Sequence, residues 1–311
     1  MDSTASTATW GLSRVPREPH RGVVIEWRGR VPEAAMPDGN VELVLMRQLA
    51  SYLAVPILVV DRHLDLVFFN ESAESILGGR FDETGGIRRG EWNSVFQTVD
   101  ALGTAFPSED RPLVIAIDRR KPAHQRFGMT GLDGVVRSIE GVAFPLETAE
   151  AGLVGAVGIF WEVSERREHA SLAQETQRRI TPSRLDVETI LLRRLAGRLQ
   201  MPILMVEPDG RLAYCNPAAE PLLGRPLAQL GGMPLPQWYD AFQPTDEDGT
   251  LIKQEDHPLN VARTRLQPCH RRLFYRALDG KRRDIEGAAF PLVGSCDRHL
   301  GAVGIFWEEP G

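Results

Sequence analysis

The sequence is poor in several features that mark particular protein classes. It has three cysteines in 311 residues, too few for the disulfide framework of a small secreted domain. The formal net charge is −6 and no block of clustered lysine and arginine occurs, which argues against a nucleic-acid surface. No apolar run approaches the ~18 residues that span a bilayer, and residues 1–10 lack the apolar centre of a secretory signal. We therefore expect a cytoplasmic protein that binds neither nucleic acid nor membranes.

The most informative feature that is present is an internal duplication. Residues 41–162 align with residues 187–308 without a gap, at a spacing of 146 residues (216 minus 70, for the matched Asn70 and Asn216). A repeat of this length exceeds the ~20–50 residues of solenoid units, so each copy should fold around its own core. We predict a flexible N-terminal segment over residues 1–40, a domain over 41–163, a charged helical linker over 164–185 and a second domain over 186–309.

Each copy begins with apolar residues at helical spacing and then reaches a proline, Pro56 or Pro202, which ends the helix. The amphipathic stripe suits either the core of its own domain or a dimer seam. A helix of about 13 residues offers only a short seam, which favours the domain's own core or a mixed role. The leucines of the stripe are Leu45, Leu49 and Leu53 in the first copy and Leu191, Leu195 and Leu199 in the second.

The rest of each copy contains two short strands, several short helices, a longer helix behind a proline, and three strands. Asp133-Gly134 and Asp279-Gly280 stand between extended runs, a strong hairpin signal. Asn70 and Asn216 follow the second strand, where a side-chain amide can cap the next helix or hold the strand exit. This order predicts an α+β class, in which each domain has a five-stranded antiparallel sheet with helices on one face.

These segments resemble the PAS family, the sensory-box domains of bacterial signalling proteins. The resemblance rests on Asn-x-x-Ala-Glu-x-x-Leu-Gly at residues 70–78 and 216–224, on a Pro-Leu helix start, on the Asp-Gly hairpin and on a closing Gly-Ala-Val-Gly strand. It implies that a ligand would lie between the sheet and the helices. The candidates for the pocket wall are Phe81, Trp92, Phe96, Leu113, Phe127 and Met129 in the first domain, and Trp238, Phe242, Leu259, Phe274 and Tyr275 in the second.

The two copies differ most in the region of this expected pocket. They diverge across residues 79–89 and 225–235, and Gly128-Met129 stands opposite Phe274-Tyr275. The scaffold is shared while the pocket wall changes, so we expect that the domains do not share one ligand. The bulk of Phe274 and Tyr275 predicts that the second cavity is filled.

No reactive set marks an enzyme. His124 and His270 are the only histidines that pair across the copies, and each is interpreted as an exposed polar residue at the start of a strand. Neither has an acidic or cysteine neighbour at metal-ligand spacing, so no metal site is predicted. The duplicated Glu140 and Glu286 are expected to face solvent or to pair with arginine on the neighbouring strand, Arg126 or Arg272.

Two further residues are weighed as cofactor ligands. Cys215 lies at the end of a strand rather than in the helical middle where a flavin photosensor of the family carries its cysteine, so it is interpreted as a small core residue. His257 could reach a haem iron, but its counterpart is Arg111. No cofactor is required, and haem and flavin are both disfavoured.

Together these features predict a non-catalytic sensory or regulatory module of signal transduction. It would bind a small molecule in one domain, or a protein, and transmit the event by domain or dimer rearrangement. We expect a homodimer or a signalling protein as partner. Two alternatives stay open: a ligand-free interaction scaffold, and a regulator that acts in transcription control through a partner, since no basic reading helix is visible in the sequence.

Overall fold

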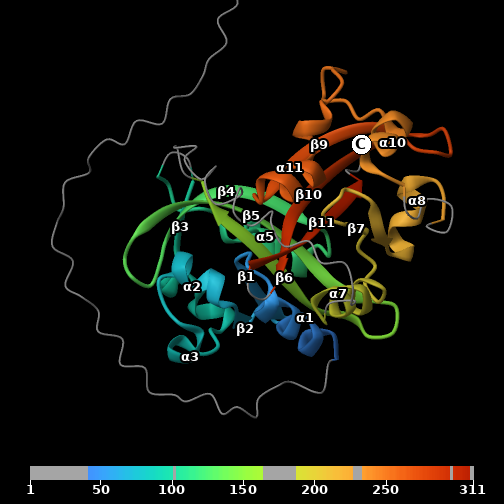
Figure 1. The fold of residues 1–311 in the computed structure, drawn as a ribbon. Helices are drawn as coiled ribbons and strands as arrows, with labels where there is room; N and C mark the ends of the chain where they lie inside the picture. Colours follow the sequence, from blue (N-terminus) through green and yellow to red (C-terminus); the bar gives the residue numbers. More distant parts are fainter. Residues whose placement is uncertain (1–40, 101–102, 164–186, 227–232, 295–296, 309–311) are drawn as a thin grey trace, which may run out of the picture.

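The computed structural model describes residues 41–100, 103–163, 187–226, 233–294 and 297–308. The predictions for residues 1–40 and for the linker over 164–185 lie outside these residues. The described chain forms two α+β domains that repeat one order of elements, the first coloured blue to green and the second yellow to red (Figure 1).

The first domain opens with α1 (Val41–Tyr52), β1 (Ile57–Asp61) and β2 (Leu66–Phe69). Short helices follow: α2 (Glu71–Leu77), α3 (Phe81–Thr84), η1 (Arg89–Glu91), α4 (Trp92–Val95), η2 (Ser108–Asp110) and α5 (Pro112–Asp118). The strands β3 (Gln97–Val99), β4 (Ala123–Thr130), β5 (Val136–Thr148) and β6 (Gly152–Glu162) complete the domain. The sheet order is β2-β1-β6-β5-β4-β3, and neighbouring strands are antiparallel.

The second domain repeats this plan with α7 (Val187–Ala196), β7 (Ile203–Val206) and β8 (Leu212–Cys215). Its helical part comprises η3 (Pro217–Ala219), α8 (Glu220–Leu223), α10 (Leu235–Phe242), η4 (Gln254–Asp256) and α11 (Pro258–Arg265). The closing strands are β9 (Cys269–Arg276), β10 (Arg282–Gly294) and β11 (Arg298–Glu308). The sheet order β8-β7-β11-β10-β9 is the predicted five-stranded antiparallel sheet.

The first sheet has one strand more than predicted. Its β3 pairs with β4 through three residue pairs. At the matching place in the second domain, Thr245 and Phe274 form a single bridge, with N···O distances of 2.7 and 2.9 Å. A three-residue edge segment carries too little alternation to be recognised in the sequence.

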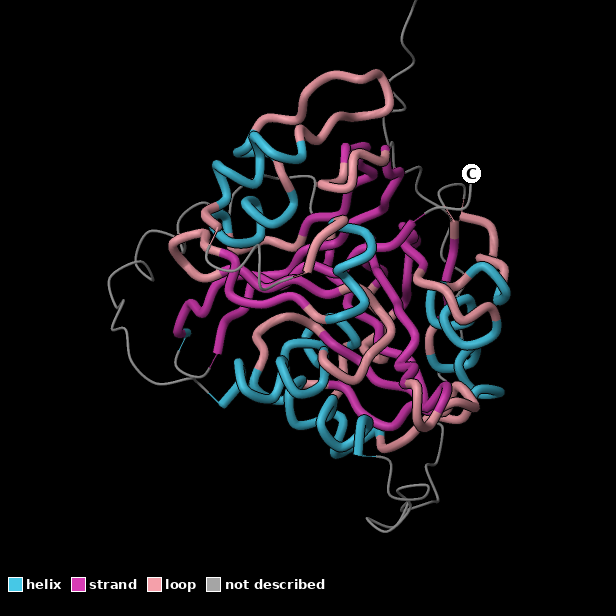
Figure 2. The backbone as a smooth tube through the Cα atoms, turned by 90° about the vertical axis from the view of Figure 1, so that its right-hand side faces the viewer, coloured by secondary structure: helices cyan, strands magenta, loops and turns pink. Residues whose placement is uncertain are grey.

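Apolar side chains gather in three cores. Each domain has an inner core between its sheet and its short helices. A third core, which we call the shared core, joins the outer faces of both sheets with α1 and α7. Neighbouring residues of a strand alternate between these cores, because successive side chains point to opposite faces: Ala143 lies in the inner core, whereas Val142 and Phe144 lie in the shared core. In Figure 2 the strands cross the middle of the molecule and the helices surround them.

The leading helices α1 and α7 pack against each other within the chain, and Figure 1 shows them side by side. Leu49 and Leu195 are each only 2% exposed, and Leu53 and Leu199 are also buried in the shared core. Leu45 and Leu191 are half-buried and pack against it. The leucine stripe therefore belongs to the interface between the two domains of one chain, and the dimer seam between chains stays a prediction.

Polar contacts also cross this interface. The Arg198 guanidinium lies 2.8 Å from a carboxylate oxygen of the buried Glu42. The backbone N–H of Gln200 donates to the carbonyl of Glu147 at 3.0 Å. The two domains are thus held together by apolar packing, a salt bridge and a backbone hydrogen bond.

Asn70 ties three elements of the first domain together. Its amide donates to the carbonyls of Ala50, Leu53 and Val55 at 3.0, 3.0 and 2.8 Å, which lie at and beyond the end of α1. Its oxygen accepts from the backbone N–H of Ile57 in β1 at 2.9 Å, and from the first turn of α2. Both predicted roles, helix cap and strand exit, are confirmed for this residue.

Asn216 repeats most of this arrangement. It donates to the carbonyls of Ala196, Leu199 and Met201 and accepts from the backbone N–H of Ile203. Of the two roles considered for it, only the strand exit is present, since η3 (Pro217–Ala219) receives no side-chain cap. Asn216 therefore serves only the strand exit and the preceding helix.

The predicted Asp-Gly hairpins are confirmed between β4 and β5 and between β9 and β10. The Asp133 carboxylate accepts from the backbone N–H of Val135 at 3.0 Å, and Gly134 has a φ of +73°. Asp279 and Gly280 repeat this geometry, with a glycine φ of +84°. Glycine adopts this left-handed conformation without steric cost.

We expect Asn70→Ala to lower the free energy of unfolding by at least about 3 kcal/mol, because it leaves several buried backbone groups without partners. Urea denaturation monitored by circular dichroism would measure this loss. Ser75→Ala is a suitable control, since Ser75 is exposed on α2 and should change stability by less than about 0.5 kcal/mol. Equal effects of the two substitutions would contradict the role given to Asn70.

We expect Leu49→Ala to destabilise the chain by about 2–5 kcal/mol, because it opens a cavity in the shared core. The same denaturation experiment would measure it. Val44→Ala changes a residue of the same helix that is 36% exposed and should cost under about 1 kcal/mol. A Leu49→Ala chain as stable as the Val44→Ala chain would show that the shared core contributes little.

Candidate functional site

The candidate site is a cavity between the sheet and the helices of the second domain. Its volume is about 100 Å³, and its wall is almost entirely apolar. An engineered apolar cavity of ~150 Å³ binds benzene, so a space of this order suits a small organic molecule. The principal apolar residues of the wall are Leu204, Leu223, Leu235, Phe242, Leu259 and Tyr275.

Three polar atoms at this cavity lack a hydrogen-bond partner among the described residues. They are Nε1 of Trp238, the hydroxyl of Tyr239 and Nδ1 of His257, and all three are buried atoms. Buried polar groups are nearly always paired, because desolvation without a partner costs ~1–3 kcal/mol. An apolar pocket with a few polar groups is the usual form of a small-molecule site.

Local sequence explains how these side chains reach the cavity. Trp238 and Tyr239 are consecutive residues of α10, a helix that starts directly behind Pro234. His257 is the extended residue before α11, which has Pro258 at its first position. Proline suits a helix start because it lacks only an N–H that the helix does not use there. The two helix starts place the polar atoms on the cavity wall opposite the sheet.

The first domain shows how the same tryptophan behaves when it is paired. Trp92 matches Trp238, and its Nε1 donates to the carbonyl of Leu64 at 3.0 Å. Gly210 occupies the position of Leu64 in the second domain. The unpaired indole N–H is therefore a difference between the copies and not a property of the shared scaffold.

The site is electrically neutral at neutral pH. Burial, reinforced by the positive charge of nearby Arg271, lowers the pKa of His257 from 6.5 to about 4. Burial also raises the pKa of Tyr239. A neutral imidazole has one donor and one acceptor, and a phenol can do either. In the first domain Arg111 replaces His257, and its Nε is likewise buried without a partner among the described residues.

Four of the five wall candidates in the second domain line the cavity: Trp238, Phe242, Leu259 and Tyr275. Phe274 does not, and the expectation that Phe274 and Tyr275 fill the cavity is wrong. Side chains alternate along β9, so Phe274 lies on the opposite face from Tyr275, under the guanidinium groups of Arg272 and Arg282 at 5.5 and 5.2 Å. Tyr275 stays against the wall because its hydroxyl donates to the Leu222 carbonyl at 2.9 Å.

The candidates in the first domain come together in its inner core. Phe96 and Met129 are buried, and the remaining four are partly buried against the same cluster: Phe81, Trp92, Leu113 and Phe127. Aromatic contacts add to this packing, with 5.1 Å between the Phe69 and Phe81 rings and 6.0 Å between those of Trp92 and Phe96.

Two of the unpaired polar residues were absent from the predicted wall. Tyr239 stands opposite Asn93, and His257 opposite Arg111. The sequence did contain a signal, because different polar residues stand at these matched positions of the two copies. The prediction of the pocket wall considered only apolar and aromatic residues. Cys215, predicted to be a core residue, is 3% exposed, and burial raises its pKa to about 11.

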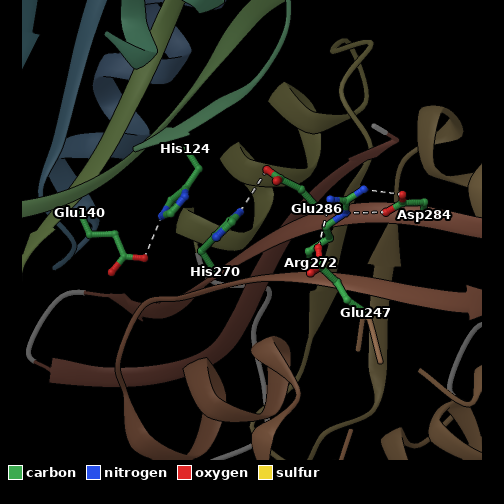
Figure 3. Close-up of polar contacts among 7 residues, drawn as sticks. All are labelled: His124, Glu140, Glu247, His270, Arg272, Asp284 and Glu286. Carbon is green, nitrogen blue, oxygen red and sulfur yellow. Dashed lines mark hydrogen bonds and ion pairs between the residues drawn. The ribbon is translucent and has the colours of Figure 1, made fainter. Parts of the chain in front are cut away.

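A second polar group lies between the domains, on the outer faces of the sheets. The rings of His124 and His270 stack with 3.6 Å between their centroids and 10° between their planes. His124 Nε2 lies 2.8 Å from Glu140 Oε1, and His270 Nε2 lies 3.3 Å from Glu286 Oε2 (Figure 3). The expectation that these histidines are exposed and lack acidic neighbours is wrong, because the pairing of β4 with β5 and of β9 with β10 supplies the carboxylates.

The glutamates also differ from expectation. Glu140 does pair with Arg126, at 2.9 Å, but its side chain is only 8% exposed. Arg272 forms salt bridges with Asp284 and Glu247, whereas Glu286 contacts His270 (Figure 3). Burial raises the pKa of Glu140. The hydrogen bond from His124 and the charge of Arg126 lower it by more, so the net pKa of Glu140 is lowered. The hydrogen bond from His270 lowers the pKa of Glu286.

Two segments of the chain match a known protein family. Residues 51–168 and 197–308 each match the family model described as the PAS fold. The chain belongs to the PAS-fold family. In the PAS fold of this chain, the cavity occupies the side of the second sheet covered by short helices, and the histidine pair occupies the opposite sides of both sheets.

Solved structures of PAS domains are similar to parts of this chain. A PAS domain from Colwellia psychrerythraea is 19% identical, covers 40% of this chain and 98% of its own, and has a TM-score of 0.30. The PAS domain of Bordetella pertussis BvgS is 23% identical, covers 44% and 94%, and has a TM-score of 0.31. An RNA-binding light-oxygen-voltage receptor is 13% identical, covers 81% and 95%, and has a TM-score of 0.31. No curated protein matches the sequence.

Within the described part of the PAS chain, no helix is both long and apolar enough to cross a bilayer.

We expect His257 to make the second domain sensitive to acid. Its folded-state pKa is about 4 against an ordinary 6.5, so between these values the unfolded chain binds a proton that the folded chain does not. This contribution to stability is complete above pH ~6.5 and is lost as the pH falls toward 4. His257→Gln should reduce the loss of unfolding free energy between pH 7 and pH 4 by up to about 3 kcal/mol.

Urea denaturation over a series of pH values would measure this effect. His63→Gln, a change at an exposed histidine of the first domain, should leave the pH dependence as it is in the unmodified chain. A His257→Gln chain with the same pH dependence as the unmodified chain would contradict the assignment.

Proposed function

We propose that this chain is a non-catalytic sensory module of signal transduction whose second PAS domain binds a small organic molecule. The observation that carries this proposal is the combination of an apolar cavity with three buried polar atoms that lack partners among the described residues. No serine, threonine, cysteine or lysine lies among the described residues of the cavity wall, and His257, with its pKa lowered to about 4, is a weak base.

The wall defines the chemistry of the ligand. The indole N–H of Trp238 can only donate, so the ligand must offer an acceptor there. Tyr239 and His257 can each donate or accept, which allows a ligand with one donor and two acceptors. The remaining wall is apolar apart from Gln254 and Asn260. A neutral, compact heteroaromatic or carbonyl compound fits these requirements, whereas a highly charged metabolite would lose its hydration without compensation.

The position of the cavity also supports a route of transmission. Ala288 of β10 and Ile305 of β11 line the cavity and also belong to the shared core. A ligand that moves these strands therefore changes the packing of both sheets at α1 and α7, because close-packed cores transmit small displacements. We propose that the signal leaves the second domain as a change in its packing against the first.

The alternative of a ligand-free scaffold has support in the first domain. There the candidate wall residues pack into the inner core, and Trp92 is satisfied by Leu64. We propose that the first domain binds no ligand and serves as the packing partner of the second domain, so that ligand binding in the second domain changes the packing between the two. The scaffold function would extend to the whole chain if the second domain bound nothing.

Gly287 provides a direct test. It lines the cavity, and a Cβ at this position would meet no atom closer than 3.9 Å. Gly287→Val therefore adds a β-branched side chain, which suits a strand, into the space for the ligand. We expect the unmodified chain, purified from cells and analysed by native mass spectrometry and solvent extraction, to carry a small molecule that Gly287→Val loses by at least about tenfold.

Gly141→Val is the matched control, since Gly141 holds the same position in the first domain. We expect this chain to retain the molecule. The molecule should also be recovered with unchanged mass after prolonged incubation, since the module is non-catalytic. If both variants retained the molecule, the ligand would lie elsewhere. The ligand-free scaffold would be favoured if the purified chain carried no molecule and no compound from a screen of heteroaromatic and carbonyl compounds stabilised it.

A further inference from the structure

We propose that the histidine pair between the domains is a binding site for a divalent transition-metal ion of the zinc class, with His124, Glu140 and His270 as ligands. Each of these residues offers one donor atom, and the three donor atoms lie within 4.8 Å of one another. Two ligands come from the first domain and one from the second, so an ion here would bridge the domains.

The fold builds this group from both sheets. His124 pairs with Val142 in the register of β4 and β5, and Glu140 lies two residues along the same strand from Val142. Both side chains therefore project from one face as diagonal neighbours. His270 occupies the matching place on β9, and packing of the two outer sheet faces stacks it on His124 (Figure 3).

Groups outside the trio bind one atom each of Glu140 and His270, and Oε1 of Glu140 is hydrogen-bonded to His124 within it. Arg126 holds Oε2 of Glu140, which leaves Oε1 beside His124. Glu286 holds Nε2 of His270, which leaves Nδ1 as the nitrogen that can reach an ion. A carboxylate on the second nitrogen of a metal-binding imidazole is a common supporting arrangement, because it orients the ring and raises its basicity.

The charges favour a cation. Two carboxylates, Glu140 and Glu286, face the imidazoles, and Arg126 pairs with Glu140 only. Around Glu286, the charge of Arg272 is taken up by Asp284 and Glu247. With neutral imidazoles the group is net negative and partly buried. A divalent ion would reverse this sign and would replace the proton shared between His124 and Glu140.

Two imidazoles and one carboxylate select the class of ion. Zinc binds imidazole nitrogen at ~2.0–2.1 Å and carboxylate oxygen at ~2.0–2.2 Å. Imidazole also suits copper, nickel and cobalt, whereas calcium and magnesium prefer sets made of oxygen. The mixed set therefore favours zinc or a similar ion over the alkaline-earth ions.

Binding has to rearrange the interface. An ion lies close to the plane of each imidazole that binds it. Two stacked rings with centroids 3.6 Å apart and planes at 10° offer no position near both rings that is close to both planes. One ring must therefore tilt out of the stack. Since His270 also stacks on Trp307 of the shared core, with 6.1 Å between the centroids, this tilt would alter the packing between the domains.

Metal titration of the full untagged chain, stripped with a chelator, tests the proposal. We expect one Zn²⁺ per chain in competition with a chelating dye, and one Co²⁺ whose visible absorption reports imidazole ligation at a low coordination number. His124→Ala and His270→Ala should each weaken binding by on the order of 100-fold or more, and Glu286→Gln by about 10–100-fold.

His63→Ala is the control, since His63 is exposed and outside the group; it should change affinity less than about twofold. Circular dichroism would verify folding, and His124→Gln and Glu140→Gln, which keep a polar side chain of similar size, replace any alanine variant that fails to fold. Stoichiometric binding lost in these variants but kept in His63→Ala supports the site. Absence of binding, or binding that all variants retain, overturns it.

Discussion

The structure depends on one buried amide in each domain. Asn70 and Asn216 are 2% and 0% exposed, and each joins the end of a leading helix to the first strand. Because the carbonyls at a helix end have no partners within the helix, a single side chain with two donors can hold the whole helix in place. That anchorage sets α1 and α7 on the outer sheet faces, where they complete the shared core.

The shared core gives the duplication its structural meaning. Each domain buries one sheet face under its own short helices and the other against its copy. The leading helices therefore bury the leucines of their stripes within the chain. The cavity of the second domain and the histidine pair lie on opposite faces of the same sheet, with β10 contributing to both. One strand therefore carries residues of both sites, because successive side chains of a strand point to opposite faces.

Local patterns in the sequence predicted most of the fold. The hairpins at Asp133 and Asp279 and the class of the sheet needed only turn chemistry and alternation. The direction of Phe274 was missed because a shift of one residue reverses the face on which a side chain lies. The contact between His124 and Glu140 depends on strand register across 16 residues (140 minus 124), and the stack of His124 on His270 depends on the packing of two domains. Neither leaves a short-range signal in the sequence.

The pairing of two domains within one chain also affects how a response would scale. A dimer of separate chains dissociates on dilution, so its signal depends on cellular abundance. Here the partner is always present at the high effective concentration of a tethered segment. The two interiors are lined differently, so they are not equivalent sites. Under the proposed function, the packing response of one chain would therefore not depend on how much of the protein a cell makes.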